Sequence, residues 1–399
     1  MIDTREGLIN ALHIASELEH GLMLQYLFAA FTLKKHQAEG LTPSQQELAR
    51  VWEGRVLSVA REEMAHLGTV FNLLTAIGGA PRLERPNFPQ PAKSYYPFPF
   101  TLTRYSDETL YRFIRFELPK GEKPPSLPVL TAEFVGPIEP DPVEFDYIGE
   151  LYGQIRAAFS SMSEETLFIG PKFAQDSEEW SRRMRILRVV DRASANAAID
   201  FIVLEGEGAP GNRKGSHYDT FLDLRAQLAT TNFDPAKAVV PNPRTRSHRE
   251  SPYPATLLEN PDAIRVAQLF NETYRATLLM LGQLYGYGGE SFGERTALRN
   301  AARQIMTMAV RPLAEILTGL PAGKDHKGLL AGPTFELHGG LQLSNQPEAR
   351  WSILTERLGL ITKAATDLAG LNSRIGLVAQ NVGLINGNLQ RARAAEERL

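Results

Sequence analysis

The stretch that decides the fold reads Ala60-Arg61-Glu62-Glu63-Met64-Ala65-His66-Leu67. On a helix, the three-residue spacing puts Glu63 and His66 on one face. The neighbouring positions of that face are apolar: Val56, Val59, Val70 and Leu73. A carboxylate in an apolar stripe is costly without a partner, so a bound cation is one explanation. A hydrogen bond between Glu63 and His66 in a metal-free core is the other.

The preceding helical pattern, from about Thr4 to Lys35, repeats this feature with Glu19. Its stripe is otherwise apolar: Leu8, Leu12, Ala15, Leu22 and Tyr26. Glu17 lines up with polar residues, and so does Glu62 in the second helix, so we expect both on solvated faces. His13 and His20 are expected on a half-exposed helix surface. Glu19, Glu63 and His66 are therefore the first candidate metal ligands.

Two later helices supply further candidates. In the helix expected from Pro142 or Val143 to Met162, Glu150 is preferred to Glu144, because an acid in a first turn is explained by the helix dipole. In the helix expected from Ser177 to Glu207, Glu207 is the preferred ligand, and Asp200 is expected to support it through a hydrogen bond.

His217 follows a break rich in glycine and proline after Glu207. If residues 208–216 loop out and the helix resumes, His217 lies near the other candidates. A capping or core histidine explains the position as well. One carboxylate from each of two helices and a Glu-x-x-His pair from each of two others is the ligand set of di-iron bundles.

Helical periodicity returns in Asp262–Tyr285, Glu294–Leu317 and Ala349–Asn372, and strand alternation is almost absent. The expected fold is all-α, a four-helix bundle with long crossover insertions and an additional C-terminal helical half. The expected domains are a metal-binding bundle over residues 1–231, a proline-rich linker over 232–254 and a helical region over 255–399.

Composition removes several classes of function. The chain has no cysteine, which excludes thiolate metal sites and disulfides, so a metal would need oxygen and imidazole ligands. A formal net charge of −3 without a dense basic run argues against nucleic-acid binding. No apolar run reaches the length of a membrane span and the N-terminus lacks a signal-peptide pattern, so a cytoplasmic protein is expected.

Several motifs, in order, resemble the ferritin-like domain of iminophenylpyruvate dimer synthases from violacein-type bisindole biosynthesis: Leu18-Glu19-His20-Gly21-Leu22-Met23-Leu24-Gln25-Tyr26, Ala60–Leu67, Ile148-Gly149-Glu150-Leu151-Tyr152, Gly206-Glu207-Gly208 and Ser216-His217-Tyr218. Leu269–Tyr274 and Ala331–Glu336 are similar to segments after that domain. The resemblance implies a ferritin-like bundle holding two iron ions, or manganese, with ligands at Glu19, Glu63, His66, Glu150, Glu207 and His217.

The leading hypothesis is a non-haem di-iron oxidoreductase that activates dioxygen on a small organic substrate of secondary metabolism. Imine dimer formation is one reaction compatible with the resemblance, although the bisindole-pathway enzymes are much longer chains. An iron-handling ferroxidase and a non-catalytic pathway partner with a structural metal site are the alternatives. A homo-oligomer is compatible with the sequence.

Overall fold

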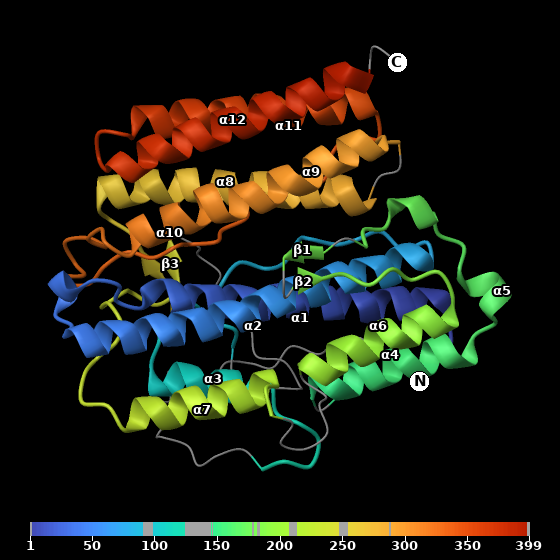
Figure 1. The fold of residues 1–399 in the computed structure, drawn as a ribbon, viewed down its shortest axis with the longest axis horizontal. Coiled ribbons are helices and arrows are strands. Elements are labelled where there is room, and N and C mark those ends of the chain that lie inside the picture. The colour runs from blue at the N-terminus through green and yellow to red at the C-terminus, as the bar shows by residue number, and fades with distance from the viewer. Residues whose placement is uncertain are drawn as a thin grey trace. The chain divides into compact units, whose positions relative to one another are not determined.

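The computed structural model describes residues 2–396 except 91–98, 124–144, 146, 178, 182–183, 207–213, 247–253 and 287–288. The chain divides into two compact units. The first consists of Met1–Ala80, Phe88–Lys237 and Arg249–Ala255, and the second of Pro81–Asn87, Ala238–His248 and Thr256–Leu399. Helices dominate each unit (Figure 1), which confirms the all-α prediction. None of the described helices combines the length and hydropathy needed to cross a membrane.

Two long antiparallel helices form the backbone of the first unit: α1 (Arg5–Thr32) and α2 (Pro43–Ala76). The Thr4 hydroxyl caps α1 by accepting a hydrogen bond from the backbone N–H of Gly7. Thr42 and Gln45 form a capping box at the start of α2, and Pro43 occupies its first turn. Both helices are unbroken, so the apolar stripes read from the sequence keep their phase along their whole length.

The opposite layer is built of four shorter helices: α3 (Asp107–Phe116), α4 (Ile148–Ser161), α6 (Arg192–Glu205) and α7 (His217–Ala229). Figure 1 shows α3 beside α7 under one end of the hairpin, and α4 beside α6 under the other. The unit is thus a four-helix bundle whose third and fourth helices are each divided into two pieces. The divisions bring helix ends, with their polar residues, to the middle of the bundle.

The expected helix over Ser177–Glu207 is wrong in its first half, because α6 begins only at Arg192. Residues before it form two short strands, β1 (Glu179–Ser181) and β2 (Met184–Arg185). Asn72 on α2 holds this segment: its amide donates to the carbonyls of Asp176 and Leu187 and accepts from the N–H of Asp176. This buried side chain competes with helical hydrogen bonding there. Minor elements of the unit are Gln37–Glu39, α5 (Glu164–Leu167) and Lys172–Ala174.

The second unit contains α8 (Pro261–Gly286), α9 (Phe292–Ile305), α10 (Arg311–Leu317), α11 (Pro347–Asp367) and α12 (Ser373–Glu396). A π-helical turn, Met306–Val310, joins α9 to α10 just before Pro312, which has no N–H to continue a regular ladder. The short strands β3 (Pro243–Arg244) and β4 (Thr256–Leu257) pair in parallel. The linker expected over 232–254 is divided between the two units. Its residues up to 237 belong to the first unit, and residues 238–248 belong to the second.

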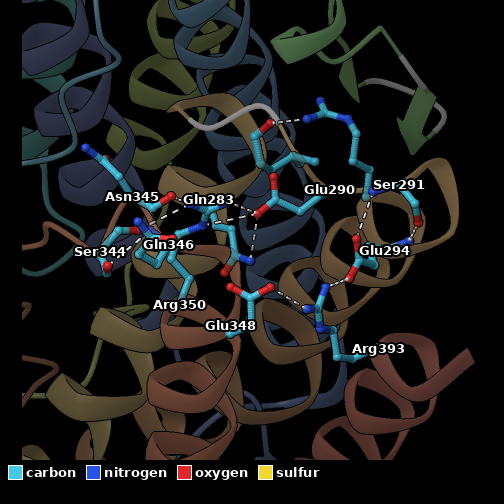
Figure 2. Close-up of polar contacts among 12 residues, drawn as sticks. Gln283, Glu290, Ser291, Glu294, Ser344, Asn345, Gln346, Glu348, Arg350 and Arg393 are labelled. Carbon is cyan, nitrogen blue, oxygen red and sulfur yellow. Dashed lines mark hydrogen bonds and ion pairs between the residues drawn. The ribbon is translucent and has the colours of Figure 1, made fainter. Parts of the chain in front are cut away.

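A buried ion pair fixes the start of α11 within the second unit (Figure 2). The Arg350 guanidinium donates to Oε1 of Glu290 through Nη2, at 2.5 Å, and Nε, at 3.2 Å. Its Nη1 donates to the carbonyls of Ser344 and Asn345. The two charged side chains are only 1% and 0% exposed. Neither charge is hydrated, so each depends on the other.

We expect Arg350→Met to lower the free energy of unfolding of the second unit by about 3 kcal/mol, because Glu290 stays buried without its guanidinium. Arg357→Met is the matched control on the same helix, since its Glu272 partner is 50% exposed. The control should cost no more than about 1 kcal/mol. Hydrogen exchange of α11 peptides at increasing urea measures both, and equal losses would contradict the assignment.

Candidate metal centre

One group of ligand-type side chains comes from the α1–α2 hairpin. Glu19, Glu63 and His66 have 0% exposure. His66 Nδ1 lies 3.0 Å from Glu63 Oε2 and 3.6 Å from Glu19 Oε2. One ligand atom from each of the three residues falls within 4.8 Å of the others. The three polar side chains that interrupt the apolar stripes of α1 and α2 therefore converge in the core.

A second group shares Glu63 and adds Glu117 and His217. His217 Nδ1 lies 3.0 Å from Glu63 Oε1 and 3.5 Å from Glu117 Oε2. Glu63 thus directs one carboxylate oxygen to each imidazole. With this geometry, a metal ion in each group would have its own histidine and its own outer carboxylate, and Glu63 would be common to both.

Glu117 and His217 reach the centre because helices end there. Glu117 is the C-terminal cap of α3, and His217 is the first residue of α7, whose N-cap Ser216 accepts a hydrogen bond from Asp219 N–H. At the end of α6, Gly206 faces both rings: a Cβ added there would lie 3.5 Å from His66 Cε1 and 3.6 Å from His217 Nδ1.

Other polar side chains surround the two groups. On the far side of the imidazoles, Glu62 Oε2 lies 3.0 Å from His217 Nε2, and Glu205 Oε2 lies 3.5 Å from His66 Nε2. The Tyr152 hydroxyl donates to Glu19 Oε1, and the Tyr26 hydroxyl donates to Glu117 Oε1. An outer carboxylate at the second nitrogen of a histidine fixes the tautomer that leaves the first nitrogen free for a metal.

Burial and mutual charge set the protonation of this cluster. Burial, with the nearby charge of Glu63, raises the pKa of Glu19 to about 8. Burial alone would also raise the pKa of Glu63, but His217 and His66 lower it overall. Burial opposes protonation of His66 and His217, yet the surrounding carboxylates raise the pKa of each well above its usual value. Protons on the imidazoles thus neutralise charge that a divalent cation could neutralise instead.

The donor set fits a pair of divalent ions. Four buried ligand atoms have no hydrogen-bond partner among the described residues: Glu19 Oε2, Glu63 Oε1, Glu117 Oε2 and His217 Nδ1. Two donors bound at right angles about 2.1 Å from one ion lie about 3.0 Å apart, close to the observed separations of 3.0–3.6 Å. Carboxylate and imidazole together suit iron or manganese.

The structure brings together four of the six predicted ligands: Glu19, Glu63, His66 and His217. Glu207 lies outside the described residues. Glu150 belongs to neither group. Because α4 starts at Ile148 rather than Pro142, Glu150 occupies the first turn, where the helix dipole accounts for an acid.

Sequence reasoning missed Glu117, although Leu110, Phe113 and Ile114 place it in an apolar stripe like that of Glu19. Glu62 was expected on a solvated face, but its side chain is 16% exposed against His217. His20, expected to be half-exposed, is 1% exposed. His217 of α7 covers Glu62, which the pattern of a single helix cannot indicate.

Comparisons with known proteins agree with this architecture. The ferritin-like family model matches residues 12–226. Dichlorochromopyrrolate synthase of Lentzea aerocolonigenes is 31% identical over 377 residues, covering 84% of this chain and 36% of the synthase. The 2-imino-3-(indol-3-yl)propanoate dimerase of Chromobacterium violaceum is 28% identical, covering 83% of this chain and 34% of the dimerase.

The chain thus spans about a third of the length of these curated relatives. A solved structure of a ferritin-like protein from Caulobacter vibrioides matches 74% of this chain and 92% of its own, with 19% identity and a TM-score of 0.46. The family model alone covers more than half of the chain, including the α1–α2 hairpin and His217. The chain belongs to the ferritin-like family.

Proposed function

We propose that the first unit holds two iron ions and acts as an oxidoreductase that uses dioxygen on a small organic substrate of secondary metabolism. The observation that carries this proposal is the position of Glu63, fully buried, with one oxygen 3.0 Å from His66 Nδ1 and the other 3.0 Å from His217 Nδ1. One ion would be held by Glu19, Glu63 and His66, and the other by Glu63, Glu117 and His217. Manganese could bind the same donors.

The names of the two relatives suggest a substrate class. One relative is named for dimerising an indolyl imino acid and the other for making a dichlorochromopyrrolate. For this chain we infer a small aromatic 2-imino acid. Joining two such molecules through a carbon–carbon bond removes two electrons and two protons, which dioxygen would accept as hydrogen peroxide. Two bound ferrous ions could relay these two electrons from the substrates to dioxygen, and they would end the reaction in the ferrous state in which they began.

The protein's own groups prepare the centre for that chemistry. Glu62 hydrogen-bonds Nε2 of His217 and so would keep Nδ1 of that ring available for a metal, and Glu205 lies 3.5 Å from Nε2 of His66. The carboxylates of Glu19 and Glu63 are fully buried and His217 is 1% exposed, so these side chains have almost no contact with bulk solvent. In such surroundings charge interactions are stronger than in water.

Metal stoichiometry tests the shared role of Glu63. We expect Glu63→Ala to reduce bound iron from two ions to fewer than one, because both groups lose a ligand. Glu19→Ala should remove only one ion, because the Glu63–Glu117–His217 group stays complete. Elemental analysis after anaerobic loading measures both, with Glu17→Ala as the control two residues away. Equal losses from Glu63→Ala and Glu19→Ala would contradict a bridging carboxylate.

A second pair of variants distinguishes Glu117 from Glu150. Glu117→Gln should lower metal content by about one ion, because its Oε2 faces His217 Nδ1. Glu150→Gln should leave the metal content unchanged, since Glu150 lies in the first turn of α4 and in neither group. The reverse result would restore the ligand set expected from the sequence.

Oxygen consumption tests the reaction. Protein loaded anaerobically with Fe²⁺ is exposed to dioxygen with and without imines formed from aromatic 2-oxo acids and ammonium. We expect dioxygen uptake coupled to dimer and peroxide formation, and no coupled uptake by Glu63→Ala. Ferric mineral formed without substrate would indicate iron handling instead. Absence of any response to dioxygen would indicate a structural metal site.

A further inference from the structure

Two buried tyrosines contact the centre in matching ways. Tyr152 on α4 donates its hydroxyl to Glu19 Oε1, and Tyr26 on α1 donates its hydroxyl to Glu117 Oε1. The tyrosines are only 1% and 0% exposed. Each carboxylate thus uses one oxygen for a phenol, so only its second oxygen is left to face a histidine.

Those second oxygens both point to the candidate metal positions. Glu19 Oε2 lies 3.6 Å from His66 Nδ1, and Glu117 Oε2 lies 3.5 Å from His217 Nδ1. Neither oxygen has a hydrogen-bond partner among the described residues. The two groups therefore repeat the same order of tyrosine, carboxylate and imidazole, although their residues come from different helices.

We propose that Tyr26 and Tyr152 are positioning residues that limit Glu117 and Glu19 to one metal-bound oxygen each, an inference that rests on the proposed metal centre. A free carboxylate can chelate an ion through both oxygens. A hydroxyl donating to a charged oxygen forms a strong bond and competes for that second oxygen. Each ion then retains a coordination position that a chelating carboxylate would fill, and a small exogenous ligand can occupy it.

Aromatic packing fixes the position of the Tyr26 hydroxyl relative to Glu117 and His217. The Tyr26 ring lies 4.6 Å from the Phe113 ring and 4.9 Å from the Phe221 ring, centroid to centroid. Phe113 is one turn before Glu117 on α3, and Phe221 is one turn after His217 on α7. The two short helices that carry the ligands therefore also hold the tyrosine in place.

If the carboxylates bind the metal and the tyrosines only restrict the carboxylates, loss of a tyrosine should change metal coordination without loss of metal. The visible spectrum of bound Co²⁺ reports the coordination number. Tyr152→Phe and Tyr26→Phe should each still bind two Co²⁺ ions. At one of the two positions, the visible absorption should weaken as the coordination number rises. Azide affinity at that position should fall about tenfold or more, as expected for loss of a charge-assisted hydrogen bond. The double variant should show both changes.

Tyr105→Phe is the matched control, because Tyr105 is also fully buried in this unit but its hydroxyl has no hydrogen-bond partner among the described residues. It should keep the wild-type spectrum and azide affinity. Unchanged spectra and azide affinity in Tyr26→Phe and Tyr152→Phe would overturn the proposal while leaving the metal centre intact.

Infrared spectroscopy of the wild-type protein tests the proposal without any variant. The separation of the two carboxylate stretching bands on Co²⁺ loading is large when one oxygen binds and small for chelation. A large separation is expected, and a chelating pattern would overturn the positioning role. Failure of the wild-type protein to bind Co²⁺ would instead overturn the metal centre on which it rests.

Discussion

The first unit depends on the burial of carboxylates that water cannot reach. Glu19, Glu63 and Glu117 each have 0% exposure, and transferring such a charge into a protein interior costs several kcal/mol unless it is compensated. Two imidazoles and two phenols supply part of the compensation. The division of the third and fourth helices places Glu117 and His217 beside these carboxylates, at helix ends in the middle of the bundle.

The convergence of the candidate ligands on unbroken helices could be predicted from the sequence. The apolar stripes on α1 and α2 are interrupted by Glu19, Glu63 and His66. Both helices are unbroken, so the 3.6-residue period predicts the direction of each side chain along the whole helix. Glu117 and Glu205 lie at the ends of α3 and α6. The apolar stripe of one helix does not predict which way a side chain points at the end of another helix. The surroundings of Glu62 could not be predicted because they depend on His217 of α7, which lies 155 positions further along the chain.

Prediction of the fold succeeded for long periodic helices and failed where side chains far apart in sequence control the backbone. Asn72 hydrogen-bonds the carbonyls of Asp176 and Leu187, which both lie before the start of α6. In the second unit, Arg85 donates to the carbonyl of Phe335, and the Asn87 amide exchanges hydrogen bonds with the Leu337 backbone. Such contacts across some 250 residues explain why Pro81–Asn87 belongs to that unit rather than to the adjoining α2. No local pattern in Pro81–Asn87 records them.

The uneven placement of the ligands along the chain has a consequence for biosynthesis. Glu19, Glu63 and His66 all belong to the α1–α2 hairpin, which is synthesised before Glu117 and His217. The second group must wait for His217 to leave the ribosome. A cation captured early would hold Glu63 in place before its other oxygen is needed, so the hairpin can serve as a template on which the remaining helices assemble.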